Sequence, residues 1–561
     1  MGEKKGEICL AYKNKQSFLY GAMVLVAASF LVKILGAIFK IPLAVLIKVD
    51  GMGLFNTSYT LYTFFVLAAK GFSIAVSKMV SESAALEKRR EADKIFYVSF
   101  VVLGILGAAG SALLYFNAQN FSSMFGNTRA SMCIRAIAPS VLFVTLVSAL
   151  RGYFQGMQNM YPTAFSEVIE ALGKLVIGMA LALLFIRSSI EQAAAGAVLG
   201  VTASTLLGLL FIAIVFIASK RKFEKGAGGK VRGARSIIKQ LLIISLPITI
   251  GASVASLANI VDVMTIMNRL QTIARVTPEF VIKYQSIIGG SFDGRINEEL
   301  ANKLYGLYSG YAVLLFNLPL TMIVALSTSV LPAISSAITR RDSKGAQTIT
   351  KSAIRITILF SLPCAVGLCV LAAPVLNLVF SNSLAADLLR TISIAIVFVS
   401  LVQVTNAILQ AYGKMHIPVI NMLIGVVVKA ALNYYLISIP SINIDGAPIG
   451  TLACYFLIAA LNIAYIIRLT KAKFGVLDYI VKPLFSALCM AVAVSFSLNV
   501  MGRAGIGDKI AVLPVIAVGA IVYIIFIFLT GAVTKADIEM MPRGEQFSRL
   551  LQKIHLLRRE N

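Results

Sequence analysis

Lysine residues lie inside the long apolar segments of this chain, where a positive charge is costly. The segment 18–47 reads FLYGAMVLVAASFLVKILGAIFKIPLAVLI, with Lys33 near its middle and Lys40 seven residues later. A lone ammonium group in hydrocarbon costs several kcal/mol, so such residues usually face a wet cavity. A spacing of seven places both lysines on one helix face, two turns apart. Ammonium groups in such a position can bind an anion inside the membrane.

Other apolar segments carry a second group of polar side chains. Glu167, Glu170 and Lys174 share one helix face in 163–186, and the spacing of four lets Glu170 and Lys174 form an ion pair. A purely structural contact between helices is as good an explanation for this pair as a role in a cavity. We expect the buried Asp262 to pair with a cation from the other half of the chain. The candidate cavity residues are Lys33, Lys40, Lys70, Glu170, Lys174, Asn259, Asp262 and Lys429.

Two lysines of the segment 54–80 differ in depth. Lys78 is close to the end of its segment, where a lysine stem can reach the interface. Lys70 is deeper, and a structural role and a cavity role are equally good explanations for it.

The composition identifies the class of protein. The chain has 561 residues, of which 58% are hydrophobic, and this is typical of a polytopic membrane protein. Its 51 basic and 25 acidic residues give a net charge of +26, spread over many short loops. That distribution indicates membrane topology rather than nucleic-acid binding. The six cysteines and two histidines show no metal-ligand spacing, so we expect neither a metal site nor disulfides.

The hydropathy pattern predicts an all-α fold with about fourteen transmembrane helices. The connecting segments on the side of the N-terminus contain about three times as many Lys and Arg residues as those on the opposite side. We therefore expect both termini to be cytoplasmic, with Arg151 in the cytoplasmic connection 151–162. The predicted spans are 18–47, 54–80, 95–116, 131–150, 163–186, 193–219, 241–268, 304–338, 352–380, 391–412, 417–439, 448–467, 483–501 and 510–531.

The two halves of the chain resemble each other at an offset of about 255 residues. The stretch IRAIAPSVLFVTLVSALRGYFQ (134–155) matches LRTISIAIVFVSLVQVTNAILQ (389–410), and Lys174 then matches Lys429. Each repeat covers six spans, and an even number keeps both in the same orientation, as in several transporter folds. The predicted parts are an N-terminus (1–17), an N-lobe (18–219), a basic linker (220–240), a C-lobe (241–470), two additional spans (471–531) and an amphipathic, basic tail (532–561).

No enzyme motif is present in the sequence. There is no Walker loop, no soluble domain and no nucleophile beside a base. We expect a protein without catalytic activity and without a cofactor.

Four stretches resemble a known family: 32–47 (VKILGAIFKIPLAVLI), 50–62 (DGMGLFNTSYTLY), 71–82 (GFSIAVSKMVSE) and 246–271 (LPITIGASVASLANIVDVMTIMNRLQ). They resemble the polysaccharide-biosynthesis flippases typified by stage V sporulation protein B. These are relatives of the MurJ-type lipid II flippases in the MOP exporter superfamily, which includes the MATE transporters. The resemblance implies two lobes, alternating access, and export of a lipid-linked sugar across the bacterial cytoplasmic membrane.

The resemblance also implies roles for particular residues. Lys33 and Lys40 match the basic positions with which MurJ-type relatives line a cationic cavity for the substrate diphosphate, and the pair of Glu170 and Lys174 matches the family pattern. Two features depart from that pattern: the segment 304–338 has no deep arginine, and the segment 269–303 is longer and more polar. The implied partners are a lipid-linked oligosaccharide substrate, membrane lipids and the cell-wall synthesis machinery, with a monomer sufficient for transport.

Two alternative functions remain. A cation-coupled multidrug or small-molecule exporter of the same superfamily would need acidic residues to dominate the cavity. Basic residues within the spans outnumber acidic ones, which favours the flippase. A non-transporting scaffold for wall synthesis would tolerate the loss of every cavity charge.

Overall fold

The protein is all-helical in the computed structural model, which describes residues 3–220, 232–288, 292–472, 474–505 and 507–533. Within these ranges no β-strand is present. Thirteen helical segments of the described chain are long and apolar enough to cross a membrane. This confirms a polytopic all-α protein, while the number of fourteen spans stays a prediction. The basic tail and the middle of the linker 220–240 lie outside the described residues.

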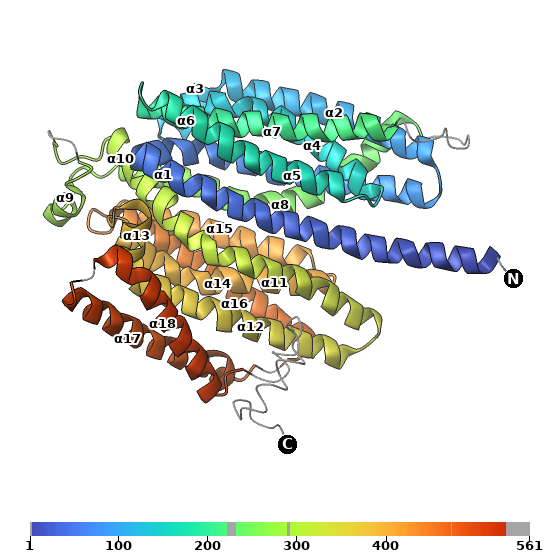
Figure 1. The fold of residues 1–561 in the computed structure, drawn as a ribbon. Helices are drawn as coiled ribbons and strands as arrows, with labels where there is room; N and C mark the ends of the chain where they lie inside the picture. Colours follow the sequence, from blue (N-terminus) through green and yellow to red (C-terminus); the bar gives the residue numbers. More distant parts are fainter. Residues whose placement is uncertain (1–2, 221–231, 289–291, 473, 506, 534–561) are drawn as a thin grey trace. The chain divides into compact units, whose positions relative to one another are not determined.

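The chain forms two compact units, Met1–Asn268 and Arg269–Asn561. In each unit the long helices run side by side (Figure 1). The first unit contains α1 (Glu3–Ala85), α2 (Arg89–Phe116), α3 (Ala118–Met124), η1 (Thr128–Ala130), α4 (Ser131–Gly156), α5 (Tyr161–Gly173), the π-helical turn η2 (Lys174–Gly178), α6 (Met179–Phe185), α7 (Ile190–Lys220) and nearly all of α8 (Ala234–Leu270).

The second unit begins with a short helical segment and continues through the remaining spans. It contains α9 (Pro278–Tyr284), α10 (Glu298–Gly306), η3 (Leu307–Ala312), α11 (Val313–Thr339), α12 (Ser343–Val370), α13 (Ala372–Phe380), α14 (Ala386–Ala411), α15 (His416–Leu436), η4 (Asn443–Asp445), α16 (Gly446–Thr470), η5 (Leu477–Val481), α17 (Lys482–Arg503) and α18 (Asp508–Leu529).

Helix α8 belongs to the first unit by its contacts. Ile237 and Leu241 are fully buried in the core of that unit, and the Thr249 hydroxyl donates to the carbonyl of Ala68 over 3.1 Å. The predicted lobes 18–219 and 241–470 therefore divide the chain at a different place from the compact units. The division into lobes itself stays a prediction.

Helix α1 reverses its direction at Lys48, where the backbone leaves the helical region (φ 55°, ψ −168°). In a straight helix, Phe39 and Phe55 would be about 24 Å apart. Their ring centroids instead lie 6.1 Å apart, so the two parts of α1 pack against each other. This reversal agrees with the predicted end of the first span at residue 47.

One predicted boundary is wrong in a way that matters for the site. Helix α4 continues to Gly156, so Arg151 lies within the helix and not in a connection 151–162. Another predicted span, 352–380, is interrupted at Leu371, where α12 ends and α13 begins.

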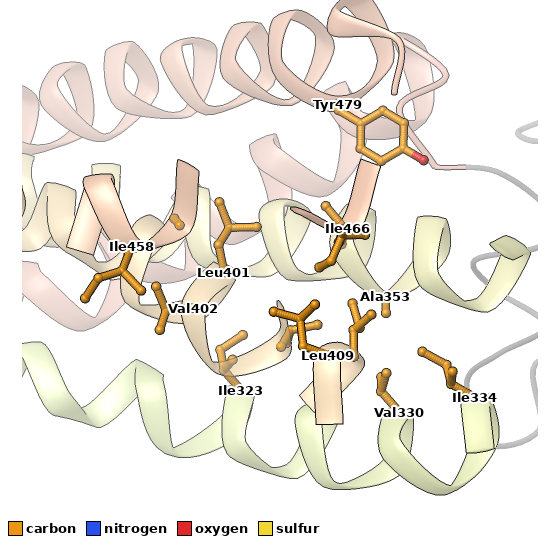
Figure 2. Packing of buried hydrophobic residues seen from close by; sticks show 14 of the residues in the cluster. Ile323, Val330, Ile334, Ala353, Leu401, Val402, Leu409, Ile458, Ile466 and Tyr479 are labelled. Atoms are coloured by element: carbon orange, nitrogen blue, oxygen red, sulfur yellow. The ribbon is translucent and has the colours of Figure 1, made fainter. Parts of the chain in front are cut away.

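Each unit is built around one buried helix. In their most apolar stretches, 67% of the residues of Thr128–Gly156 and 72% of those of Ala386–Ala411 are buried. These helices, α4 and α14, contain the two stretches that the sequence repeat matches. Figure 2 shows the core around α14, where Leu401, Val402 and Leu409 lie among aliphatic residues of α11, α12 and α16.

The long polar segment before α10 is attached to the second unit by ion pairs. The ammonium group of Lys283 in α9 lies 3.0 Å from Asp387 and 3.3 Å from Asp445. Burial lowers the pKa of Lys283, whereas Tyr284 and the two carboxylates raise it, and the resulting pKa lies above the usual range of lysine. The segment is therefore anchored through its charged residues.

Candidate cation cluster of the first unit

Glu170 of α5 is the centre of a buried polar cluster. Its carboxylate lies 2.9 Å from the ammonium group of Lys174, which confirms the ion pair predicted from their spacing. Arg151 of α4 donates to the same carboxylate over 3.1 Å, and the Tyr62 hydroxyl of α1 donates to it over 2.7 Å. One carboxylate thus connects α5 with α4 and α1 and neutralises only one of its two cations.

Arg151 is the member of this cluster that sequence reasoning missed. Its Nε donates to the Ser166 hydroxyl over 2.9 Å, and its Nη1 lies 4.0 Å from Glu167. The repeat contained the signal for it, because the match runs without a break over 134–155 and implies one continuous helix through residue 151.

Lys40 lies against aromatic and cationic neighbours. Its ammonium group is 4.5 Å from the centre of the Tyr59 ring, a geometry in which the ring stabilises the charge. It is also near enough to Lys174 to be repelled by it. A similar contact places Lys174 4.9 Å from the Tyr62 ring centre.

Lys33 and Lys70 form a second cationic group. Lys33 is partly buried and Lys70 is exposed, and the two are close enough to repel each other. In the described part of the chain neither lysine has a carboxylate within ion-pair distance. The reversal at Lys48 is what brings the two together, since they are far apart along α1.

The cluster as a whole carries more positive than negative charge. Its cations are Lys33, Lys40, Lys70, Arg151 and Lys174, and its carboxylates are Glu167 and Glu170. Three positive charges therefore have no carboxylate to balance them within the cluster. Charges within membrane helices normally occur in pairs or face a wet cavity, so an excess of this size favours a site for an anion.

A pocket of about 210 Å³ opens within this cluster. It lies between α1, α4, α5 and α7, and polar side chains supply much of its lining. The polar lining residues are Tyr62, Lys70, Ser73, Ser148, Arg151, Gln155, Glu167, Glu170 and Thr205.

The other predicted cavity residues lie on helices other than those of this cluster. Asn259 is exposed and Asp262 is buried, both on α8 of the first unit. Lys429 is only 3% exposed and lies on α15 of the second unit. The predicted pairing of Asp262 with a cation of the other half stays a prediction.

The corresponding helices of the second unit hold an uncharged network. Asn462 of α16 donates to Thr405 over 3.0 Å and to Asn406 over 2.8 Å, and it accepts from Asn421 over 2.8 Å. In the repeat Asn406 occupies the position of Arg151. An amide group in the second unit thus takes the place of the Arg151 guanidinium group, while Lys429 keeps the charge of Lys174.

Comparison with known proteins identifies the family. The profile of the family described as "Polysaccharide biosynthesis protein" matches residues 18–338, and that of "Lipid II flippase MurJ" matches residues 306–510. Stage V sporulation protein B of Bacillus subtilis (strain 168) is 26% identical over 533 residues, covering 94% of this chain and 98% of that protein. The lipid II flippase MurJ of the same organism is 24% identical, covering 78% of this chain and 80% of the relative.

Solved structures share the fold. A lipid II flippase MurJ in an inward closed conformation superposes with a TM-score of 0.62 at 17% identity, covering 90% of this chain and 98% of that one. An inward-facing MATE transporter of the MOP superfamily gives a TM-score of 0.60 at 17% identity, covering 77% of this chain and 94% of that one. Since the first profile matches more than half of its residues, the chain belongs to the polysaccharide biosynthesis protein family.

Proposed function

We propose that this protein is a flippase that moves a lipid-linked sugar across the bacterial cytoplasmic membrane. The substrate is an undecaprenyl-diphosphate-linked sugar, either lipid II or a related precursor of cell wall, spore cortex or polysaccharide. The observation that supports this most directly is the excess of cations among α1, α4 and the α5–η2 segment of the first unit. The relatives, which include a lipid II flippase, agree with it.

The chemistry of the substrate matches the cluster. A diphosphate linkage carries about two negative charges at neutral pH, and Lys and Arg are the side chains that bind phosphate oxygens. Lys33 and Lys70 are the cations to which we assign the diphosphate, because no carboxylate competes for them in the described chain. Lys40, whose ammonium group lies over the Tyr59 ring, adds a further positive charge to the cluster.

The remaining predicted residues divide into two roles. Glu170 and Lys174 fix the arrangement of α1, α4 and α5 through their short contacts. Asn259, Asp262 and Lys429 stay candidates for cavity positions that a transported head group meets during alternating access.

The test is translocation of fluorescent lipid II in proteoliposomes. A hydrogen bond to a charged group contributes about 1.5–3 kcal/mol, so Lys33→Ala should lower the translocation rate at least about tenfold. Lys78→Ala is the matched control, because it removes an exposed lysine from the same helix nearer its end. The purified variants should unfold at the same temperature as the wild type.

Two results would contradict the proposal. Wild-type rates in Lys33→Ala and in Lys70→Ala would show that these cations do not bind the substrate. Transport of cationic dyes in place of lipid II would identify the protein as an exporter.

A further inference from the structure

The pocket of about 210 Å³ contains donor groups that nothing in the described protein uses. The Nε and Nη2 of Arg151 are held by Ser166 and Glu170, at 2.9 and 3.1 Å. Nη1 makes no hydrogen bond in the described chain, and it lies 4.0 Å from a carboxylate oxygen of Glu167. The guanidinium group is thus fixed by two of its nitrogens and open at the third.

Two further donors line the same pocket. Lys70 has neither a carboxylate nor a hydrogen-bond partner in the described residues, and the Gln155 amide likewise makes no hydrogen bond there. The liquid volume of one water is about 30 Å³, so the pocket has room for a group several waters in size. Donors fixed in advance around such a space bind an anion at a low cost in ordering.

Two carboxylates line the pocket, and Glu167 is the one that opposes an anion most, because Glu170 is neutralised by its close cations. Its carboxylate accepts a long hydrogen bond of 3.4 Å from Ser29 and lies 4.0 Å from Arg151. Glu170, in contrast, makes three short contacts with Lys174, Arg151 and Tyr62. Glu167 is therefore weakly held and balances Arg151 while the pocket contains no ligand.

We propose that this pocket is an oxyanion subsite for the head group of the transported lipid. Arg151, Lys70 and Gln155 are its donors, and Glu167 is the counter-ion that the ligand displaces. The ligand is a phosphate or a carboxylate group, and the subsite selects head groups that carry one. This inference rests on the proposed function for its physiological ligand, whereas the existence of an anion site can be tested separately.

The decisive variant is Glu167→Gln, because it leaves the contact between Arg151 and Glu170 intact. Removing the competing carboxylate should tighten the binding of lipid II to detergent-solubilised protein about fivefold, the low end of typical couplings between charged sites. Arg151→Gln should weaken binding about tenfold. Lys78→Ala is the control that changes the net charge outside the pocket, and it should bind like the wild type.

Three lipid probes separate the sources of the oxyanion. An effect of both pocket variants on undecaprenyl diphosphate would assign the subsite to the diphosphate. An effect on lipid II that disappears when its peptide carboxylates are methylated would assign it to those carboxylates. Unchanged binding of all three lipids by Glu167→Gln would overturn the proposal, even where Arg151→Gln fails to fold.

Inorganic diphosphate serves as a probe that does not depend on the proposed function. At constant ionic strength it should raise the unfolding temperature of Glu167→Gln more than that of the wild type, and sulfate should act in the same direction. If the wild type binds no lipid diphosphate but the two anions still stabilise Glu167→Gln more than the wild type, the anion subsite is supported and the flippase function is contradicted. If Lys33→Ala loses lipid binding while the wild type and Glu167→Gln respond equally to all probes, the flippase function is supported and the anion subsite is contradicted.

Discussion

Glu170 shows how single residues stabilise the polar interior of the first unit. A buried carboxylate that accepts from an ammonium, a guanidinium and a phenol has its lone pairs satisfied by three helices. Removing its charge leaves Lys174 and Arg151 buried beside a neutral amide. Breaking a buried ion pair from one side costs about 3 kcal/mol or more, since the remaining charge has no compensation.

Glu170→Gln should therefore destabilise the protein strongly, while Glu167→Gln should not. The expected result is a clear fall in the unfolding temperature for Glu170→Gln, measured by thermal denaturation in detergent. Adding Lys174→Met to Glu170→Gln should restore part of the loss, because it removes one uncompensated charge. Equal stability of the two glutamine variants would contradict the structural role of Glu170.

Local spacing explains which parts of this cluster the sequence could predict. The contact between Glu170 and Lys174 follows from a separation of four residues on a helix, and the structure confirms it. The proximity of Lys33 and Lys70 depends on the reversal at Lys48. The proximity of Arg151 to Glu170 depends on where α4 ends. Contacts between distant segments have no local pattern, so the cluster could not be assembled from the sequence alone.

At the scale of elements, the turn at Lys48 determines how the two parts of α1 meet. Its φ of 55° with ψ of −168° lies in a region that is essentially confined to glycine and costs about 1–3 kcal/mol for other residues. Arg129 lies nearby in the fold and donates to Asp50 through both terminal nitrogens, at 3.0 and 2.8 Å, and to Glu191 at 2.7 Å. These contacts hold the turn against its strain.

Lys48→Gly should relieve this strain and raise the unfolding temperature by about 1 °C or more, after the entropy of the unfolded glycine is subtracted. Lys48→Ala is the control, because alanine keeps the Cβ atom that causes the strain. A lower unfolding temperature for the glycine variant than for the alanine variant would show that the turn is not strained. Thermal denaturation of the three proteins under one set of conditions decides the matter.

Glycine residues set the distance between other helices. A Cβ atom on Gly200 of α7 would lie 2.2 Å from the Cα of Gly178, and backbone cannot move aside as a side chain can. Gly200→Ala should therefore cost about 2 kcal/mol or more through forced separation of α7 from η2. Gly36→Ala is the matched control, since no atom lies within 4 Å of its added Cβ. Comparable unfolding temperatures for both variants would contradict this close packing.

The sequence predicts elements better than it predicts their ends. Thirteen described segments are suited to cross a membrane, because long apolar runs leave few other solutions. The break at Leu371 has no hydropathy signal, because apolar residues continue through it. The extension of α4 to Gly156 is signalled by the repeat and not by hydropathy. Helix ends depend on tertiary packing, which hydropathy does not report.

At the scale of the whole molecule, the repeated halves have diverged in charge. The helices that correspond in the repeat, α4 and α14, occupy the centres of their units. In the first unit Arg151 of α4 contacts Glu170, whereas in the second unit Asn406 of α14 belongs to an amide network with Asn421 and Asn462, and Lys429 keeps the charge of Lys174. A shared fold with unequal charge suits a transporter whose anionic substrate binds mainly to one half.

A charged substrate makes the final distribution of lipid sensitive to the membrane potential. If the protein exports a diphosphate lipid without a coupling ion, each cycle moves about two negative charges outward, each worth about 2.3 kcal/mol per 100 mV. In proteoliposomes with a potassium diffusion potential, negative inside, labelled lipid II should accumulate in the outer leaflet. The equilibrium does not depend on the orientation of the protein, so mixed insertion does not obscure it. Lys33→Ala should approach the same distribution more slowly, because a variant with weaker binding changes the rate and not the equilibrium. A distribution that ignores the potential would require a cation to move with the lipid, and repeating the measurement with sodium or proton gradients would then identify that cation.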